Sequence, residues 1–204
     1  MAIHDTVLSV IGISPDMEPS AEASLRKLIE GNERYLSAGY GGDISAAARK
    51  DKKEKGQHPF AAIVTCSDSR VIPEVVFSAG IGDIFVIRTA GNTMDSASLD
   101  SLEYAAHHLH VPLVAVMGHT NCGAVAAALK RDGGDTLGIV RTIRTAIGIE
   151  KDPCRASEMN VLNSVSEIKK KLDVPVVGMI YDILTGEIRI IGNNIPWNDS
   201  AVTA

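Results

Sequence analysis

The sequence predicts an α/β fold: a mostly parallel central β-sheet flanked by helices, with an antiparallel C-terminal edge hairpin and an N-terminal helical arm. Short, almost continuously apolar runs are typical of parallel strands covered on both faces, and they occur at residues 60–66, 83–91 and 112–119. Two later runs, at 174–183 and 187–192, flank a glycine turn and predict an antiparallel pair.

Apolar residues at helical spacing predict the helices between these strands. Ser20 can cap a first helix that runs to about Ala38, where Gly39 stops it. Residues 39–58 are glycine-rich and then strongly charged, which indicates a solvated connection with a short helix inside. Three further helices are expected. The first is marked by Leu99, Leu102, Ala106 and Leu109, the second begins at residue 123, and the third covers residues 157–172.

Length and composition indicate one domain. The chain has 204 residues and is 45% hydrophobic, which suits a single compact core. We therefore expect one domain over residues 1–204. It comprises a helical arm with its connection at residues 1–58, an α/β core at 59–192 and a tail at 193–204.

Charge and cysteine content restrict the partners and the compartment. The formal charge of −5 offers no field to attract nucleic acid or an anionic membrane. Three cysteines cannot form a disulfide framework and fit a reducing, cytoplasmic setting. The start of the chain lacks a basic region, and no stretch approaches the roughly 18 apolar residues of a spanning helix, so neither a signal peptide nor a membrane anchor is expected.

Two motifs, CSDSR at 66–70 and HTNC at 119–122, follow the ends of predicted parallel strands. Open α/β sheets place their ligands at this edge, so the two motifs are expected to converge. Cys66, His119 and Cys122 would then present two thiolates and one imidazole, a donor set that suits zinc. Three protein ligands leave the fourth tetrahedral position open, as in catalytic zinc sites.

Each motif also has an ordinary explanation when it is taken alone. A cysteine that ends a buried strand is often a small core residue, and Asp68 with Arg70 can be a turn-stabilising ion pair. The two motifs together favour a metal. Beside an open zinc position, Asp68 can accept a hydrogen bond from zinc-bound hydroxide while Arg70 keeps it ionised. Cys154 has no acidic residue and arginine in a comparable motif after it, and it is expected in a loop.

The paired motifs resemble the signature of the β-class carbonic anhydrases, a CxDxR segment followed by HxxCG, which here reads CSDSR and HTNCG. The resemblance continues through LIEGNERY, VIRTAGN, LEYA and GMIYDILTGEI. It implies a carbonate dehydratase, a lyase that hydrates carbon dioxide reversibly to bicarbonate and a proton by attack of zinc-bound hydroxide. One Zn²⁺ per subunit would be held by Cys66, His119 and Cys122.

The resemblance also implies roles for further residues. Asp68 and Arg70 would form the catalytic dyad, and Asp68 could become a fourth zinc ligand in a closed state. The substrate pocket would contain the amide of Gln57 from the partner subunit. It would also contain two aromatic residues, Phe85 and Tyr104, and the small apolar Ala90. The implied assembly is a homodimer or a dimer of dimers, because the family builds its active site at the subunit interface.

Other functions stay open beside this one. Carbonyl sulfide or carbon disulfide could be hydrolysed by the same hydroxide, and a non-catalytic zinc-binding homologue could keep the fold. The presence of Asp68 and Arg70 argues against a purely structural zinc site. A dinucleotide site is disfavoured because AGIGDI lacks the full glycine fingerprint and precedes a strand, and no CxxC motif supports a thioredoxin-like function.

Overall fold

The computed structural model describes residues 20–130 and 138–193. Its centre is a five-stranded sheet in the order β2-β1-β3-β4-β5. The strands are β1 (Ala61–Cys66), β2 (Ile84–Thr89), β3 (Val114–His119), β4 (Val176–Tyr181) and β5 (Ile188–Asn193). The first four are parallel and β5 is antiparallel to β4, so the predicted sheet with its antiparallel C-terminal edge is confirmed.

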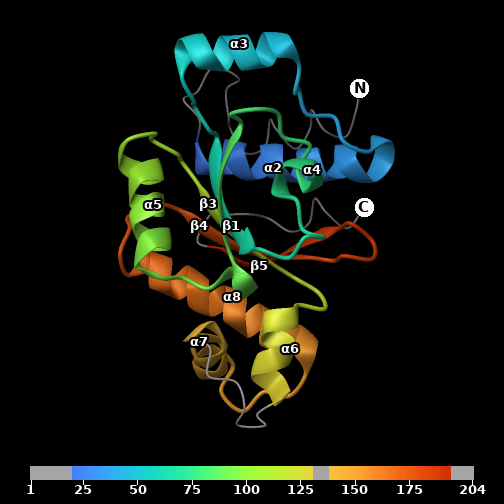
Figure 1. Ribbon diagram of the computed structural model, residues 1–204, viewed down its shortest axis with the longest axis vertical. Helices are drawn as coiled ribbons and strands as arrows, with labels where there is room; N and C mark the ends of the chain where they lie inside the picture. Colours follow the sequence, from blue (N-terminus) through green and yellow to red (C-terminus); the bar gives the residue numbers. More distant parts are fainter. Residues whose placement is uncertain (1–19, 131–137, 194–204) are drawn as a thin grey trace, which may run out of the picture.

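Helices cover both faces of this sheet (Figure 1). They are α2 (Ala21–Ala38), α3 (Ala46–Lys55), α4 (Pro73–Val76), α5 (Ser96–His107), α6 (Gly123–Lys130), α7 (Gly138–Ile147) and α8 (Pro153–Lys169), with a 3₁₀ turn η1 (Ala90–Asn92). In Figure 1, α2 and α4 lie on one face, α5 and α8 on the other, and α6 and α7 extend beyond α8. None of the helices in the described ranges is long and apolar enough to cross a membrane.

The N-terminal helix has the bounds that its sequence predicts. The Ser20 hydroxyl accepts a hydrogen bond from the Ala23 amide at 3.1 Å, and Gly39 ends α2 with a φ of 77°, which favours glycine. Helix α3 has no buried residue, as expected for a solvated connection that contains a short helix.

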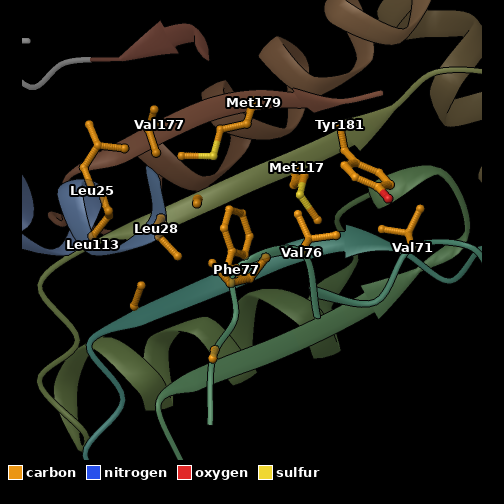
Figure 2. Close-up of a cluster of buried hydrophobic side chains, with 14 of the residues drawn as sticks. Leu25, Leu28, Val71, Val76, Phe77, Leu113, Met117, Val177, Met179 and Tyr181 are labelled. Atoms are coloured by element: carbon orange, nitrogen blue, oxygen red, sulfur yellow. The ribbon is translucent and has the colours of Figure 1, made fainter. Parts of the chain in front are cut away.

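Two apolar clusters hold the helices to the sheet. The cluster beneath α2 is drawn in Figure 2, and its labelled side chains are Leu25, Leu28, Val71, Val76, Phe77, Leu113, Met117, Val177, Met179 and Tyr181. On the opposite face, α8 lies so close to β3 that a Cβ at Gly118 would stand 2.5 Å from Val161 Cγ2. This close approach fixes α8 beside the strand that ends in His119.

The structure corrects three details of the predicted elements. Helix α8 begins at Pro153 because Asp152 caps it, so Cys154 lies in the first helical turn and not in a loop. Helix α5 ends at His107, and Ala105, not Ala106, joins its buried face. Strand β5 includes Asn193, which we had assigned to the tail. The arm before residue 20 and the tail from residue 194 lie outside the described residues.

Asn32 is expected to contribute more to stability than any surface polar residue of α2. Its side-chain amide donates to the carbonyls of Val76 and Gly186 at 3.1 and 2.9 Å and accepts from the Ile188 amide at 3.2 Å. Asn32→Ala leaves these buried groups without partners, so the free energy of unfolding should fall by about 3 kcal/mol in urea denaturation. The exposed Ser37 bonds only within α2, and Ser37→Ala should change it by less than about 0.5 kcal/mol. Equal losses for the two variants would contradict the bridging role of Asn32.

Candidate metal centre

The carboxyl ends of β1 and β3 bring the two predicted motifs together. The strands are adjacent and parallel, and Thr65 is paired with Met117, so Cys66 ends beside the segment that leads to His119. Cys122 follows one turn later, directly before α6. The Sγ atoms of Cys66 and Cys122 are 4.0 Å apart, and all three potential ligand atoms lie within 4.8 Å of one another in a buried cluster.

This donor set fits a tetrahedral metal ion. Two sulfur ligands at zinc distances of about 2.3 Å are separated by about 3.8 Å, close to the spacing of the two thiols. His119 Nδ1 faces the Thr120 carbonyl at 2.9 Å, which makes Nδ1 the donor and leaves the lone pair on Nε2. Nε2 is buried and has no hydrogen-bond partner among the described residues. The cluster can therefore hold a metal ion through Cys66, His119 and Cys122.

The electrostatics of the cluster follow from its two sulfur atoms. The hydrogen bond between them lowers the pKa of Cys66, whereas the same contact, together with burial, raises the pKa of Cys122. Burial lowers the pKa of His119, but the Cys66 sulfur, the Thr120 carbonyl and the Asp68 carboxylate together raise it, so the net pKa shift is upward. The two sulfur atoms therefore shift each other's pKa in opposite directions, and a cation bound between them would neutralise both thiolates.

Asp68 and Arg70 form a bidentate ion pair at the edge of the cluster. Arg70 Nε and Nη2 donate to the two carboxylate oxygens of Asp68 at 2.9 and 2.7 Å. These hydrogen bonds hold the pKa of Asp68 well below its usual range. Asp68 Oδ2 lies 4.0 Å from His119 Nε2, and Arg70 Nη2 also donates to the Asn121 carbonyl at 3.2 Å. Arg70 therefore links the CSDSR motif to the HTNC motif.

The structure adds residues that the sequence reasoning missed. Arg88, near the end of β2, donates to the carbonyls of Cys66, Asp68 and Val71 at 3.2, 2.8 and 2.8 Å, so it fixes the loop that carries Asp68. Gly91 donates its amide to Cys66 Sγ at 3.2 Å. Both lie in the VIRTAGN segment, whose only signal in the sequence was its resemblance to a family motif.

The predicted substrate-pocket residues do not all gather at the cluster. Ala90 precedes Gly91 and lies beside it. Phe85 is paired with Ala62, four residues before Cys66 and about 13 Å away along the strand. Tyr104 is 48% exposed on α5, with its ring centroid 6.4 Å from that of Phe85, and Gln57 precedes β1 at the end opposite to Cys66. Within a single chain, Gln57, Phe85 and Tyr104 therefore lie away from the three candidate metal ligands.

A cavity of about 840 Å³ lies elsewhere, between α2, β5 and α8. Its lining includes Thr120 but none of the three candidate ligands. The cavity therefore does not contain the candidate metal cluster at the ends of β1 and β3.

Comparison with known proteins agrees with this geometry. The carbonic anhydrase family model matches residues 61–188, a range that contains both motifs. A carbonic anhydrase of Mycolicibacterium smegmatis is 41% identical over 188 residues, which cover 88% of this chain and 91% of that protein. The chain belongs to the β-class carbonic anhydrase family.

Other carbonic anhydrases resemble the chain over part of its length. Carbonic anhydrase 2 of Mycobacterium tuberculosis is 45% identical over 123 residues, which span 59% of this chain and 59% of the relative. One of the two tetrameric β-carbonic anhydrases of Sordaria macrospora is 27% identical, with a TM-score of 0.56, and the match covers 72% of this chain and 92% of that one. The fold of the described core is therefore that of the family.

Proposed function

We propose that the protein hydrates carbon dioxide reversibly to bicarbonate and a proton, with one Zn²⁺ per subunit held by Cys66, His119 and Cys122. The observation that carries this proposal is the convergence of these three buried side chains next to an ionised carboxylate. Asp68 Oδ2 lies 4.0 Å from His119 Nε2, the nitrogen that is left free for a metal. Family membership supports the same reaction.

The donor set supports zinc over harder cations. Two thiolates and an imidazole suit zinc, whereas magnesium and calcium prefer oxygen ligands. When bound, the ion supplies Lewis-acid activation of water at neutral pH. Three protein ligands leave room for that water, as catalytic zinc sites require.

Asp68 and Arg70 supply the remaining chemistry. The carboxylate of Asp68 is ionised and can accept a hydrogen bond from the attacking water, which orients its lone pair toward carbon dioxide. Arg70 holds both oxygens of this carboxylate and fixes its direction. Carbon dioxide is small and uncharged, so the pocket needs apolar walls more than charged recognition.

A homodimer would complete the pocket. Gln57 and Cys66 lie at opposite ends of β1, whose residues rise about 3.3 Å each, so Gln57 does not reach the ligands of its own chain. The partly exposed Phe85 and Tyr104 lie on β2 and α5, away from the cluster. We propose that these three residues line the pocket of a partner subunit, in a homodimer or a dimer of dimers.

Stopped-flow carbon dioxide hydration tests the proposed activity. The Zn²⁺-loaded wild-type protein should be active from neutral to alkaline pH, and Asp68→Ala should lower kcat/KM about 100-fold while its zinc content stays unchanged. Asp100→Ala removes an exposed carboxylate of α5 and should retain wild-type activity. Zinc content is measured on every sample, so that loss of metal is separated from loss of catalysis.

Two results would overturn the proposal. A wild-type protein with a full zinc complement and no hydration over this pH range would exclude carbonic anhydrase activity, and turnover of carbonyl sulfide or carbon disulfide would then identify the substrate. Equal activity of Asp68→Ala and the wild type would exclude the carboxylate from the reaction.

A further inference from the structure

Two buried polar side chains on α8 face the turn that lies behind the metal cluster. Asn160 is 1% exposed and Ser164 is 2% exposed, and they lie one helical turn apart among apolar residues of the same helix, Val161, Val165 and Ile168. Burying an amide and a hydroxyl costs free energy unless both find hydrogen-bond partners. Their partners therefore indicate why polar residues stand on this face.

Both side chains bind consecutive carbonyl groups of η1. Asn160 Nδ2 donates to the Gly91 carbonyl at 2.7 Å, and Ser164 Oγ donates to the Asn92 carbonyl at 2.9 Å. Gly91 and Asn92 have φ angles of 65° and 46°, a left-handed pair that an asparagine adopts only at a cost. The two bonds from α8 stabilise this turn from outside.

The conformation of the turn decides where the Gly91 amide points. That amide donates to Cys66 Sγ at 3.2 Å, and the Asp68 amide donates to the same sulfur at 3.4 Å. An N–H group that donates to a ligand sulfur fixes the orientation of that sulfur, and loss of such an outer partner lowers metal affinity. The chain of contacts runs from α8 through η1 to the first candidate ligand.

We propose that Asn160 and Ser164 are positioning residues that hold the Gly91 amide on Cys66 and so raise the metal affinity of the cluster. This inference rests on the proposed metal site. A purely structural pair would satisfy the carbonyls of η1 and stabilise the fold without any effect on the metal. The two roles differ in what happens to metal binding once the fold is intact.

Helix α8 offers a matched control. Ser157 is a second buried serine, and its hydroxyl donates to the Pro153 carbonyl of its own helix at 2.9 Å. The Ser164 hydroxyl has one hydrogen to donate and lies 3.2 Å from the Asn160 carbonyl of its own helix and 2.9 Å from the Asn92 carbonyl, which is the closer acceptor. Ser164→Ala and Ser157→Ala therefore remove the same group from the same helix, and only the first reaches η1.

The experiment measures metal binding separately from folding. Zn²⁺ affinity of the full chain is determined by competition with a chromophoric chelator, and thermal unfolding of the metal-free protein reports the fold. We expect Ser164→Ala and Asn160→Leu to weaken Zn²⁺ binding by about 10-fold or more, and Ser157→Ala to leave it unchanged. In the Co²⁺-loaded protein, the thiolate-to-cobalt absorption band should shift in the first two variants only.

Contrary results are equally specific. The inference would be overturned if Ser164→Ala bound Zn²⁺ as tightly as the wild type and showed an unshifted cobalt band, with the metal-free variant and the metal-free wild type both folded. Asn160 and Ser164 would then be purely structural. A wild-type chain that binds no Zn²⁺ would overturn the metal site and this inference together. A wild-type chain that binds Zn²⁺ but hydrates no carbon dioxide would overturn the proposed activity alone and leave the affinity measurements to decide this inference.

Discussion

Cys122→Ala is expected to abolish zinc binding and, with it, carbon dioxide hydration. The substitution removes one of three buried ligand atoms and leaves Cys66 and His119, which cannot close a stable site alone. Loss of an outer partner of a ligand already costs 10–100-fold in affinity or activity, so loss of a ligand itself should lower kcat/KM by at least about 1,000-fold. Zinc per chain, measured by elemental analysis after purification, should fall from one to near zero.

Cys154 provides the control for this substitution. It is an exposed thiol in the first turn of α8 and takes no part in the cluster. Cys154→Ala should keep one zinc per chain and wild-type activity. If Cys122→Ala still retained a full equivalent of tightly bound zinc, the ion would sit elsewhere and the proposed ligand set would be wrong.

The sheet and the metal cluster were predictable because their signals are local in the sequence. Parallel strands buried on both faces are continuous apolar runs, and such runs gave β1, β2 and β3 to within one or two residues. The carboxyl ends of parallel strands share one edge, so two motifs after two strands had to converge. The parallel pairing of β1 with β3 brings Cys66 beside the segment that ends in His119.

Elements that depend on tertiary packing were harder to predict. Helix α7 was not predicted, although Val140, Ile143 and Ile147 recur at helical spacing and are buried in the structure. The helix is only ten residues long and gains its stability from packing against α6 and α8. The helical spacing of its buried residues is nevertheless a local signal for this helix.

The contacts around the candidate metal ligands could not have been predicted from spacing. Arg88 lies 22 residues after Cys66, and Asn160 lies 69 residues after Gly91, yet each meets its partner through hydrogen bonds. Nothing in a sequence distinguishes a buried asparagine that binds a remote carbonyl from one that faces solvent on a helix. Such positioning contacts are properties of the folded chain.

Mixed dimers are expected to recover activity that neither parent variant has. One parent is Cys122→Ala, which lacks a metal at its own site but still carries Gln57 and Tyr104. The other is Gln57→Ala with Tyr104→Ala, which keeps all three metal ligands. If a subunit lends these side chains to its partner, one of the two sites in each mixed dimer combines intact ligands with an intact pocket, and the rate should reach about half that of the wild type.

Co-expression with two different affinity tags and sequential purification isolates the mixed dimer for stopped-flow assay. Tyr104 is about half exposed and Gln57 is exposed, so both can be truncated without opening the core. If each chain completed its own pocket, both sites of the mixed dimer would be defective and its rate would not exceed that of the Gln57→Ala, Tyr104→Ala parent. Failure to recover any doubly tagged species would argue against the dimer itself. Gln57 and Cys66, which lie at opposite ends of β1, would then have no partner subunit through which to meet.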